Sequence, residues 1–439
     1  MRRVSIAENG KEIKPVLSLL TDLGDALALF VCNTSSSFTD SDNQRNQEKT
    51  RSRKLEFPGA EITVFSPERG FVRELDPRTG LVHSVNFTYS NGAYRFSTPM
   101  ERFASRLYII TDKKLSEVRP AVSHEKASGM SVGLPAVGLE FEVDEDNVIV
   151  LDHASYKIAN RESDGEEFVL EIDDKIRDAI GCQHRGGHMC QPWTRRNEPD
   201  GIAVPVSLAF KFKCAVLPAS DCFLALEMAD SFAVEINGRR IEKKNCGFWM
   251  DPCLVKIPVP RDCIVRGENK IVISGKYNRK MTGMEAMFLI GRFGVDAAGC
   301  MVAYPKSISI GDWVPQGLPN YTGNLTYRIP LPEIPAGSRA VVRVPRWRGA
   351  ALEIGVNDGE KTLVPWSPYE LDISGKTGAG ANTLEITVYG NRRNACGPFY
   401  FKNTAEEGWY GPGQMRRHDF AERELVMMGI LKQVELIIR

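Results

Sequence analysis

The sequence predicts an all-β protein built from tandem β-sandwiches. Three observations carry this prediction. Short alternating runs of apolar and polar residues, bounded by Gly, Pro, Asn or Asp, dominate the 439 residues, a pattern typical of half-buried strands. The chain contains 38 Gly and 25 Pro, which suits many tight turns. Helical periodicity is scarce, and one short helix is expected over 173–180, where Ile176 and Ile180 share a face.

The expected strands are distributed along the whole chain. The clearest are 60–65, 208–216, 223–228, 270–274, 340–344 and 383–389. At roughly 150 residues per domain, the length suggests three domains, and we place them at 15–115, 135–298 and 303–439. The first contains a polar stretch, 35–54, with almost no apolar residues. We expect that stretch to be a long exposed loop or a disordered insert.

The second and third domains have the sequence features of two copies of one fold. Pro335 follows Pro218 by 117 residues, each in a Pro-Ala turn after an apolar residue. Gly380, which opens a Gly-x-Asn turn, follows the corresponding Gly267 by 113 residues. Matches at a nearly constant offset predict two sandwiches of the same type in tandem.

Several segments occur in an order that resembles a known family. They are 29–33, 76–80, 173–177, 185–187, 191–193, 316–327, 347–354 and 391–398. They resemble the C-terminal region of large glycoside hydrolases of the family-two-like and α-L-rhamnosidase-like kinds, in which β-sandwiches follow a catalytic (β/α)₈ barrel. The resemblance implies that the first domain is the small sandwich that follows the barrel. It also implies that the last two domains are galactose-binding-like jelly rolls.

The resemblance further implies an accessory function. A barrel needs about 250 residues, and fewer than 20 precede the first sandwich, so the family's catalytic carboxylates have no counterpart here. We therefore assign no catalytic residue. We expect a non-catalytic accessory region of a glycoside hydrolase, which packs against a catalytic barrel on a separate chain and binds carbohydrate. The alternatives are a free-standing carbohydrate-binding protein, or a glycosidase whose site is not visible in the sequence.

Aromatic residues in turn-rich sequence are the candidate carbohydrate-binding residues. They are Trp193, Trp249, Trp313, Tyr321 and Trp366, and Trp347 has a similar setting. A flat ring can stack on the apolar face of a pyranose while neighbouring polar groups bind the hydroxyls. The alternative is packing in a core or between domains, which accounts for most Trp side chains in tandem sandwiches.

One cysteine- and histidine-rich segment is a candidate metal site. Cys182, His184, His188 and Cys190 lie within nine residues, and thiolates with imidazoles suit Zn²⁺. All four share one short loop, however, so we expect a Gly-rich loop without metal and no cofactor.

Asp230, Asp251 and Glu285 have apolar neighbours in the sequence. Glycosidic hydrolysis needs two carboxyl groups about 5–10 Å apart, and sequence spacing brings no pair of these together. Asp251 precedes Pro252, which favours a turn.

The charge balance excludes some partners. With 56 Lys and Arg against 56 Asp and Glu, the chain has no net field to attract nucleic acid or an anionic membrane. The longest apolar run, 16–31, contains Asp22 and Asp25 and is shorter than the roughly 20 residues of a membrane span. We see no export signal and expect a cytoplasmic protein with reduced cysteines, or an extracytoplasmic one if the natural chain begins upstream.

Overall fold

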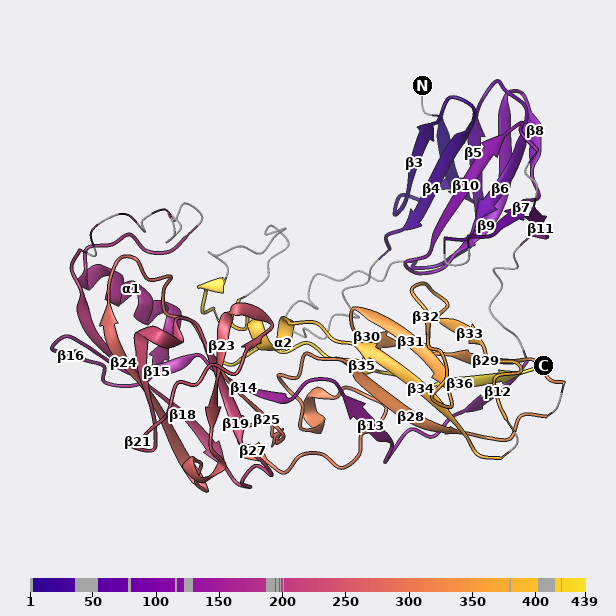
Figure 1. The fold of residues 1–439 in the computed structure, drawn as a ribbon. Coiled ribbons are helices and arrows are strands. Elements are labelled where there is room, and N and C mark those ends of the chain that lie inside the picture. Colours follow the sequence, from indigo (N-terminus) through magenta and orange to yellow (C-terminus); the bar gives the residue numbers. More distant parts are fainter. Residues whose placement is uncertain are drawn as a thin grey trace.

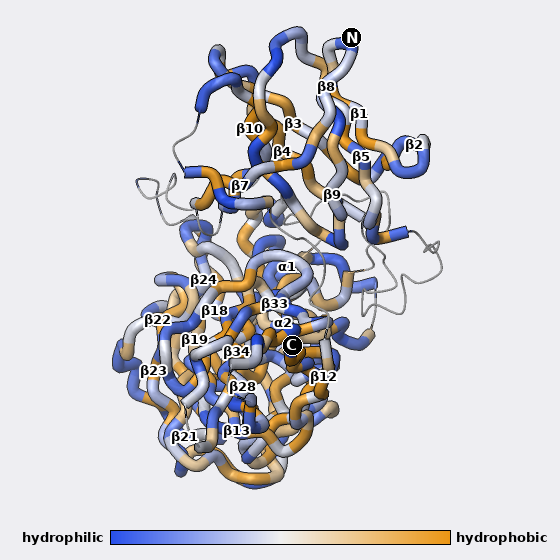
Figure 2. Tube along the Cα trace, turned by 90° about the vertical axis from the view of Figure 1, so that its right-hand side faces the viewer, coloured by the Kyte–Doolittle hydropathy of each residue, from blue (hydrophilic) through white to orange (hydrophobic). Residues whose placement is uncertain are grey.

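The computed structural model describes residues 3–35, 54–77, 80–114, 117–121, 129–186, 194, 197, 199, 201–335, 337–378, 380–401, 415–419 and 421–439. Pairs of sheets form successive sandwiches along the chain (Figure 1), so the predicted all-β tandem architecture is confirmed. The predicted polar loop, 35–54, lies outside the described residues except at its two ends. Hydrophobic segments concentrate in the strands and hydrophilic ones at the turns (Figure 2).

The first sandwich is built from two sheets. One has the order β2-β1-β5-β9-β8, with β1 Val4–Glu8, β2 Lys11–Glu12, β5 Phe57–Phe65, β8 Thr88–Ser90 and β9 Ala93–Met100. The other has the order β11-β7-β6-β10-β4-β3, with β3 Val16–Asp22, β4 Leu27–Asn33, β6 Phe71–Leu75, β7 Val82–Ser84, β10 Ser105–Thr111 and β11 Val118–Arg119. Alternate side chains of the central strands, among them Leu29 and Ile62, fill the core between the sheets.

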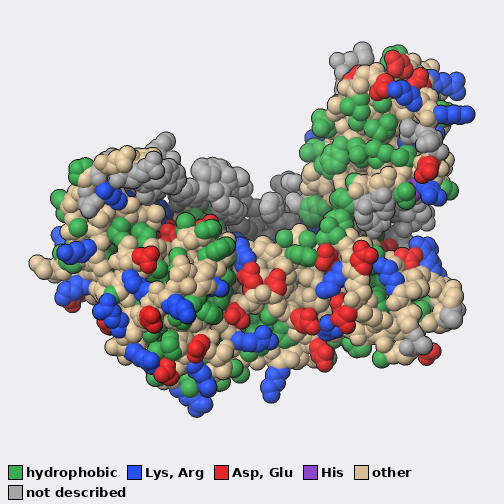
Figure 3. Space-filling model, viewed as in Figure 1, with side chains coloured by type: hydrophobic (Ala, Val, Ile, Leu, Met, Phe, Trp, Pro, Cys, Tyr) green, Lys and Arg blue, Asp and Glu red, His purple; other side chains and the backbone are tan. Residues whose placement is uncertain are grey.

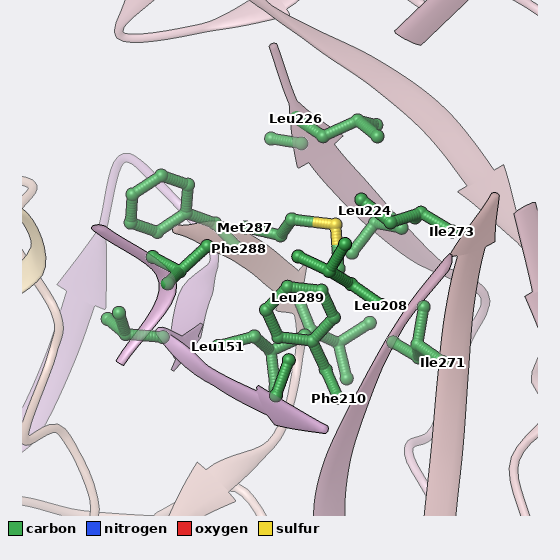
Figure 4. Packing of buried hydrophobic residues seen from close by; sticks show 14 of the residues in the cluster. Leu151, Leu208, Phe210, Leu224, Leu226, Ile271, Ile273, Met287, Phe288 and Leu289 are labelled. Atoms are coloured by element: carbon green, nitrogen blue, oxygen red, sulfur yellow. The ribbon is translucent and has the colours of Figure 1, made fainter. Parts of the chain in front are cut away.

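The second sandwich has a five-stranded sheet of order β14-β25-β19-β23-β22. Its strands are β14 Asn147–Leu151, β19 Cys222–Leu226, β22 Phe248–Trp249, β23 Asp251–Val259 and β25 Met287–Gly291. The facing sheet contains β15 His153–Ile158, β16 Arg161–Glu162, β17 Glu167–Phe168, β18 Val204–Cys214, β20 Phe232–Ile236, β21 Arg239–Arg240, β24 Gly267–Tyr277, β26 Gly294–Val295 and β27 Met301–Val302. Leu208, Phe210 and Leu289 are among the residues that pack between the two sheets (Figure 4).

One helix, α1 (Val169–Ala179), packs on the second sandwich. The helix expected over 173–180 is therefore present and begins four residues earlier. Val169, Leu170 and Ile172 are buried together with Ile176. Burial of this apolar face extends the helix beyond the segment in which local periodicity was visible.

The third sandwich also has two sheets. One has the order β12-β36-β29-β33, with β12 Met130–Gly133, β29 Ala340–Arg343, β33 Glu370–Asp372 and β36 Glu435–Ile438. The other has the order β13-β28-β34-β31-β32, with β13 Glu140–Val143, β28 Leu325–Leu331, β31 Ala351–Val356, β32 Thr362–Leu363 and β34 Asn382–Tyr389. A separate pair joins β30 (Trp347–Arg348) to β35 (Gly429–Ile430), and α2 (Arg393–Cys396) follows β34.

The second sandwich is inserted into the third. Strands β12 and β13 precede the second sandwich in the chain, yet β12 pairs with β36 and β13 pairs with β28. Residues 135–143, which the sequence boundaries grouped with the second domain, thus contribute to the third. The difference arises because the internal repeat reports local strand order, whereas these pairings join segments more than 180 residues apart.

The second and third sandwiches are joined by direct contacts. Asn147 Nδ2 donates to the carbonyl oxygens of Phe293 and Gly317, both at 2.9 Å. After β34 the chain returns to the second sandwich, where Phe399 and Tyr400 belong to its buried core. This return brings residues of α2 and the segment after it against the five-stranded sheet.

Candidate functional site

A pocket opens where the second sandwich meets the segment after β34 that returns to it, residues 393–401, here called the returning segment. Its volume is about 250 Å³, and it lies between the five-stranded sheet, the start of α1 and residues 395–399. Its apolar walls include Phe168, Met250, Phe288, Phe399 and Met415, and its carboxylates are Asp152, Glu227 and Glu285. A concave apolar cavity with a few polar groups is the usual form of a small-molecule site.

Asp152 is fully engaged by neighbouring groups of the protein. His153 Nδ1 lies 3.0 Å from its Oδ1, the Tyr400 hydroxyl lies 3.1 Å from its Oδ2, and the Arg423 guanidinium forms an ion pair with it. Burial alone would raise the pKa of Asp152, but the hydrogen bond with His153 and the charge of Arg423 outweigh burial and hold that pKa at about 2. Asp152 therefore stays ionised and ties the returning segment to the sandwich.

Glu285 is held by a chain of charges that begins on α1. Asp173, which is fully buried, accepts hydrogen bonds from Arg177 Nε and Arg185 Nε, both at 2.8 Å. Arg185 also donates from Nη2 to the Met284 carbonyl at 2.6 Å and forms an ion pair with Glu285. Asp173 thus orients Arg185, and Arg185 orients Glu285 at the pocket wall.

Glu227 is the pocket carboxylate without a cation. It directly follows β19 and accepts a hydrogen bond from Thr282 Oγ1 at 3.2 Å. Within the described part of the chain, no Lys, Arg or His forms an ion pair with it. Burial, followed by the like charge of Glu285, raises the pKa of Glu227. Glu227 can therefore accept from a ligand when ionised and donate to it when protonated.

Only one of the three carboxylates with apolar sequence neighbours reaches the pocket. Glu285 lines it, whereas Asp230 and Asp251 are exposed and are not among its walls. Asp251 Oδ1 accepts from the Cys253 amide at 2.8 Å, the turn arrangement that the sequence suggested. Glu227 was missed, although its neighbours, Leu226 and Met228, give it the same apolar setting that marked Glu285.

The predicted carbohydrate-binding aromatic residues do not gather at one surface. Trp313 and Tyr321 are 0% and 1% exposed and lie in the third core. Their rings contact each other edge to face, with 5.9 Å between the ring centroids. Trp249 is buried in the second core and packs on the pocket residue Phe288, with 4.7 Å between the ring centroids. Fully buried rings offer no free face to a sugar. Trp366 is half-buried, and Trp193 lies outside the described residues.

Trp347, the additional aromatic residue of the sequence analysis, is also half-buried. Its ring contacts Tyr369 edge to face at 5.4 Å.

The Cys182–Cys190 loop is described only in part, because His188 and Cys190 lie outside the described residues. His184 Nε2 lies 2.7 Å from Asp178 Oδ1, so its ring is engaged by α1. Among the residues that the structure places, no group of three His, Cys, Asp or Glu side chains is arranged to hold a metal ion. The described helices include none of the length and hydropathy that crossing a membrane requires.

The first sandwich carries a second feature, an apolar outer sheet face. Leu17 and Leu19 on β3 and Phe30 on β4 are 54%, 64% and 41% exposed, and Leu19 lies directly opposite Phe30. We call these three residues the β3–β4 face. Figure 3 shows hydrophobic side chains gathered over this part of the molecule. A contiguous exposed apolar patch marks an interaction surface.

The neighbouring strand positions extend this pattern. In β4, Leu27, Leu29 and Val31 point into the core, while Ala28 and Phe30 alternate with them on the outside. A strand that is apolar on both faces is typical of a sheet covered on both sides. In the described part of the chain, no segment covers this outer face sufficiently to bury Leu17, Leu19 or Phe30.

Comparisons with known proteins give only low-scoring structural alignments. No family model and no curated protein matches the chain. A rhamnosidase from Novosphingobium sp. PP1Y aligns with a TM-score of 0.38 and 12% identity, over 100% of this chain and 25% of that one. A β-D-mannosidase from Dictyoglomus thermophilum aligns with a TM-score of 0.21 and 10% identity, over 57% and 31%.

The α-L-rhamnosidase of Streptomyces avermitilis aligns with a TM-score of 0.17 and 12% identity, over 71% of this chain and 38% of that one. The chain therefore spans between a quarter and two fifths of the length of these three glycoside hydrolases. These alignments transfer no site residue to this chain.

Proposed function

We propose that this chain is a non-catalytic accessory region of a glycoside hydrolase, and that its first sandwich packs against a catalytic (β/α)₈ barrel on a separate chain. The observation that carries the proposal is the β3–β4 face, Leu17, Leu19 and Phe30. Because these side chains are about half exposed, burying the rest of each contributes roughly 0.8–1.5 kcal/mol, and the three together favour docking. The resemblance of the sequence to post-barrel sandwiches supports the choice of this class of partner.

The test uses the full chain and a purified α-L-rhamnosidase-type barrel domain. We expect sedimentation velocity to show a complex with the wild type and its loss in the double variant Leu19→Ser, Phe30→Ser. The chain alone should self-associate weakly, and the same variant should suppress this. A matched control is Val265→Ser, an exposed apolar residue of the second sandwich. A wild-type protein that stays a monodisperse monomer and does not bind the barrel domain would overturn the docking role.

A second candidate, a free-standing carbohydrate-binding protein, is favoured by the pocket. Phenylalanine rings beside carboxylates form a combination suited to the apolar faces and the hydroxyl groups of a sugar. Glycan-array binding by the purified chain, lost on Glu227→Gln, would support this role without any barrel.

A third candidate is a glycosidase. Glu227, with its raised pKa, would be the acid, and Glu285, beside Arg185, the base or nucleophile. Turnover of aryl glycosides by the wild type, abolished in both Glu227→Gln and Glu285→Gln, would establish it and overturn the accessory role. Binding without turnover would exclude it.

A further inference from the structure

The carboxylates of the pocket are not equally compensated. Three carboxylates line it, Asp152, Glu227 and Glu285, and the neighbouring helix α1 adds Asp173 and Asp174. Four guanidinium groups face them, and each is in an ion pair: Arg423 with Asp152, Arg177 with Asp173, Arg185 with Asp173 and Glu285, and Arg416 with Asp174. Of the three lining carboxylates, Asp152 and Glu285 are in ion pairs, whereas no Lys, Arg or His among the described residues forms one with Glu227.

We propose that the pocket binds a small sugar that carries a protonated amine, with the ammonium group on Glu227 and the ring against the apolar walls. This inference is independent of the docking role and deepens the carbohydrate-binding candidate, on which it rests. It names a site and a ligand class, an amino sugar, that neither the sequence motifs nor the comparisons indicated.

The size and lining of the pocket favour a single sugar ring. Its volume of about 250 Å³ is just below the roughly 300–1,000 Å³ of pockets for drug-sized ligands. Phe168, Phe288 and Phe399 provide apolar surface for the C–H face of a pyranose, and Glu285 retains acceptor capacity for hydroxyl groups. A small open-chain amine would leave much of this apolar surface uncovered.

The state of Glu227 favours an amine over a neutral sugar. A hydroxyl donor can satisfy the hydrogen bonding of Glu227 but leaves its partly buried charge uncompensated. An ammonium donor satisfies both, because it places an opposite charge beside the carboxylate in addition to the hydrogen bond. Burial and the charge of Glu285, which disfavour the ionised carboxylate in the free pocket, are then offset by the ligand.

The proposal predicts a specific pH dependence. The groups that act on Glu227 are Glu285 and Asp251, which raise its pKa, and Arg185 and the Thr282 hydroxyl, which lower it. The charge of Glu227 contributes to the raised pKa of the Cys253 thiol on β23. The Cys396 thiol lines the same pocket. Affinity for an amino sugar should therefore rise with pH through the raised pKa of Glu227. Affinity for a neutral sugar should change little.

The test is calorimetric titration of the full chain with glucosamine, glucose, N-acetylglucosamine and cyclohexylamine, at pH 4.5 and pH 7. We expect glucosamine to bind about tenfold or more tightly than each of the others at pH 7, and less tightly at pH 4.5. Glu227→Gln should remove this preference. Asp230→Asn, an exposed carboxylate three residues away, should retain it.

The other outcomes separate this inference from the proposals on which it builds. Equal affinity for glucose and glucosamine overturns the amine preference but leaves a carbohydrate-binding site. Cyclohexylamine binding as tightly as glucosamine overturns the sugar class. Binding of none of the four overturns both the inference and the carbohydrate-binding candidate, while the docking role is still decided by sedimentation. Retained preference in Glu227→Gln overturns the assignment of the ammonium position.

Discussion

Asn237 donates from Nδ2 to Oδ1 of Asn269 at 2.8 Å in the second sandwich. The third sandwich repeats this arrangement, since Asn357 Nδ2 donates to Asn382 Oδ1 at 2.6 Å. In both sandwiches the first asparagine has a positive φ, 50° and 56°, and its Oδ1 accepts from the amide that follows the second. The same turn device at equivalent places indicates that the two sandwiches are of one type.

Loss of the second asparagine should destabilise its own sandwich. Asn269 is fully buried, and its Nδ2 also donates to the carbonyls of Val265 and Gly267. Asn269→Ala leaves these groups and Asn237 unsatisfied, and we expect a loss of about 2–4 kcal/mol. Urea denaturation followed by tryptophan fluorescence measures it. Asn245→Ala, at an exposed turn, is the control, and an equal loss there would contradict the explanation.

Substitutions on the inner and outer faces of the β3–β4 sheet should differ greatly in their effect on stability. Leu29 is fully buried on β4, and Leu29→Ala should cost about 2–5 kcal/mol. Leu19 is 64% exposed on β3, and Leu19→Ser should change the free energy of unfolding by under about 0.5 kcal/mol. Thermal melting together with sedimentation separates stability from association. A large loss of stability in Leu19→Ser would show that this side chain already contributes to the core.

Asp173 should be the residue of the second sandwich least tolerant of neutralisation. It is fully buried and accepts hydrogen bonds from Arg177, Arg185 and the Met284 amide. Asp173→Asn leaves two buried guanidinium groups without their common counter-charge, and we expect a loss of about 3–5 kcal/mol. Chemical denaturation checks this, with the exposed Asp262→Asn as control. A loss below about 1 kcal/mol would refute the role of Asp173 in holding Arg185.

Asp152 should make the protein sensitive to acid. Its folded pKa of about 2 is below the roughly 3.9 of an unfolded Asp. The ionised carboxylate therefore stabilises the fold above about pH 4, and this contribution is lost as pH falls from about 4 to about 2. Asp152→Asn should be less stable at pH 7 by about 2–4 kcal/mol and should approach the wild type near pH 2. A difference independent of pH would show that packing is responsible.

The ionised carboxylate of Glu227 should have the opposite effect on stability, because it destabilises the folded protein. Because its folded pKa is raised, protonation favours the folded state, and this stabilisation is lost as pH rises through the raised pKa. Glu227→Gln should therefore melt about 2–4 °C higher than the wild type at pH 7, with a smaller difference near pH 4. Differential scanning calorimetry at both values tests this. A lower melting temperature of the variant at pH 7 would mean that a cation compensates Glu227 in the free protein.

Local patterns in the sequence predicted the strands well and the site poorly. The segments around Leu208, Phe223 and Thr383 are strands, as predicted. They could be predicted because alternation and flanking turns depend only on neighbouring residues. The pocket depends on Glu227, Glu285 and Phe399, which belong to three distant segments, and no spacing rule relates them. Turn-rich sequence around Trp313 suggested an exposed ring. The ring is buried because the segments of the third sandwich close over it.

The order of strands in the third sandwich also constrains how the protein is made. Strands β12 and β13 leave the ribosome before the second sandwich, and β28 begins at Leu325, 182 residues after Val143. At roughly 5–20 residues per second, this interval lasts about 10–40 s. During synthesis, β12 and β13 therefore lack their partner strands while the inserted sandwich is being made. The sheets that contain β12 and β13 can therefore be completed only after the inserted sandwich has been synthesised.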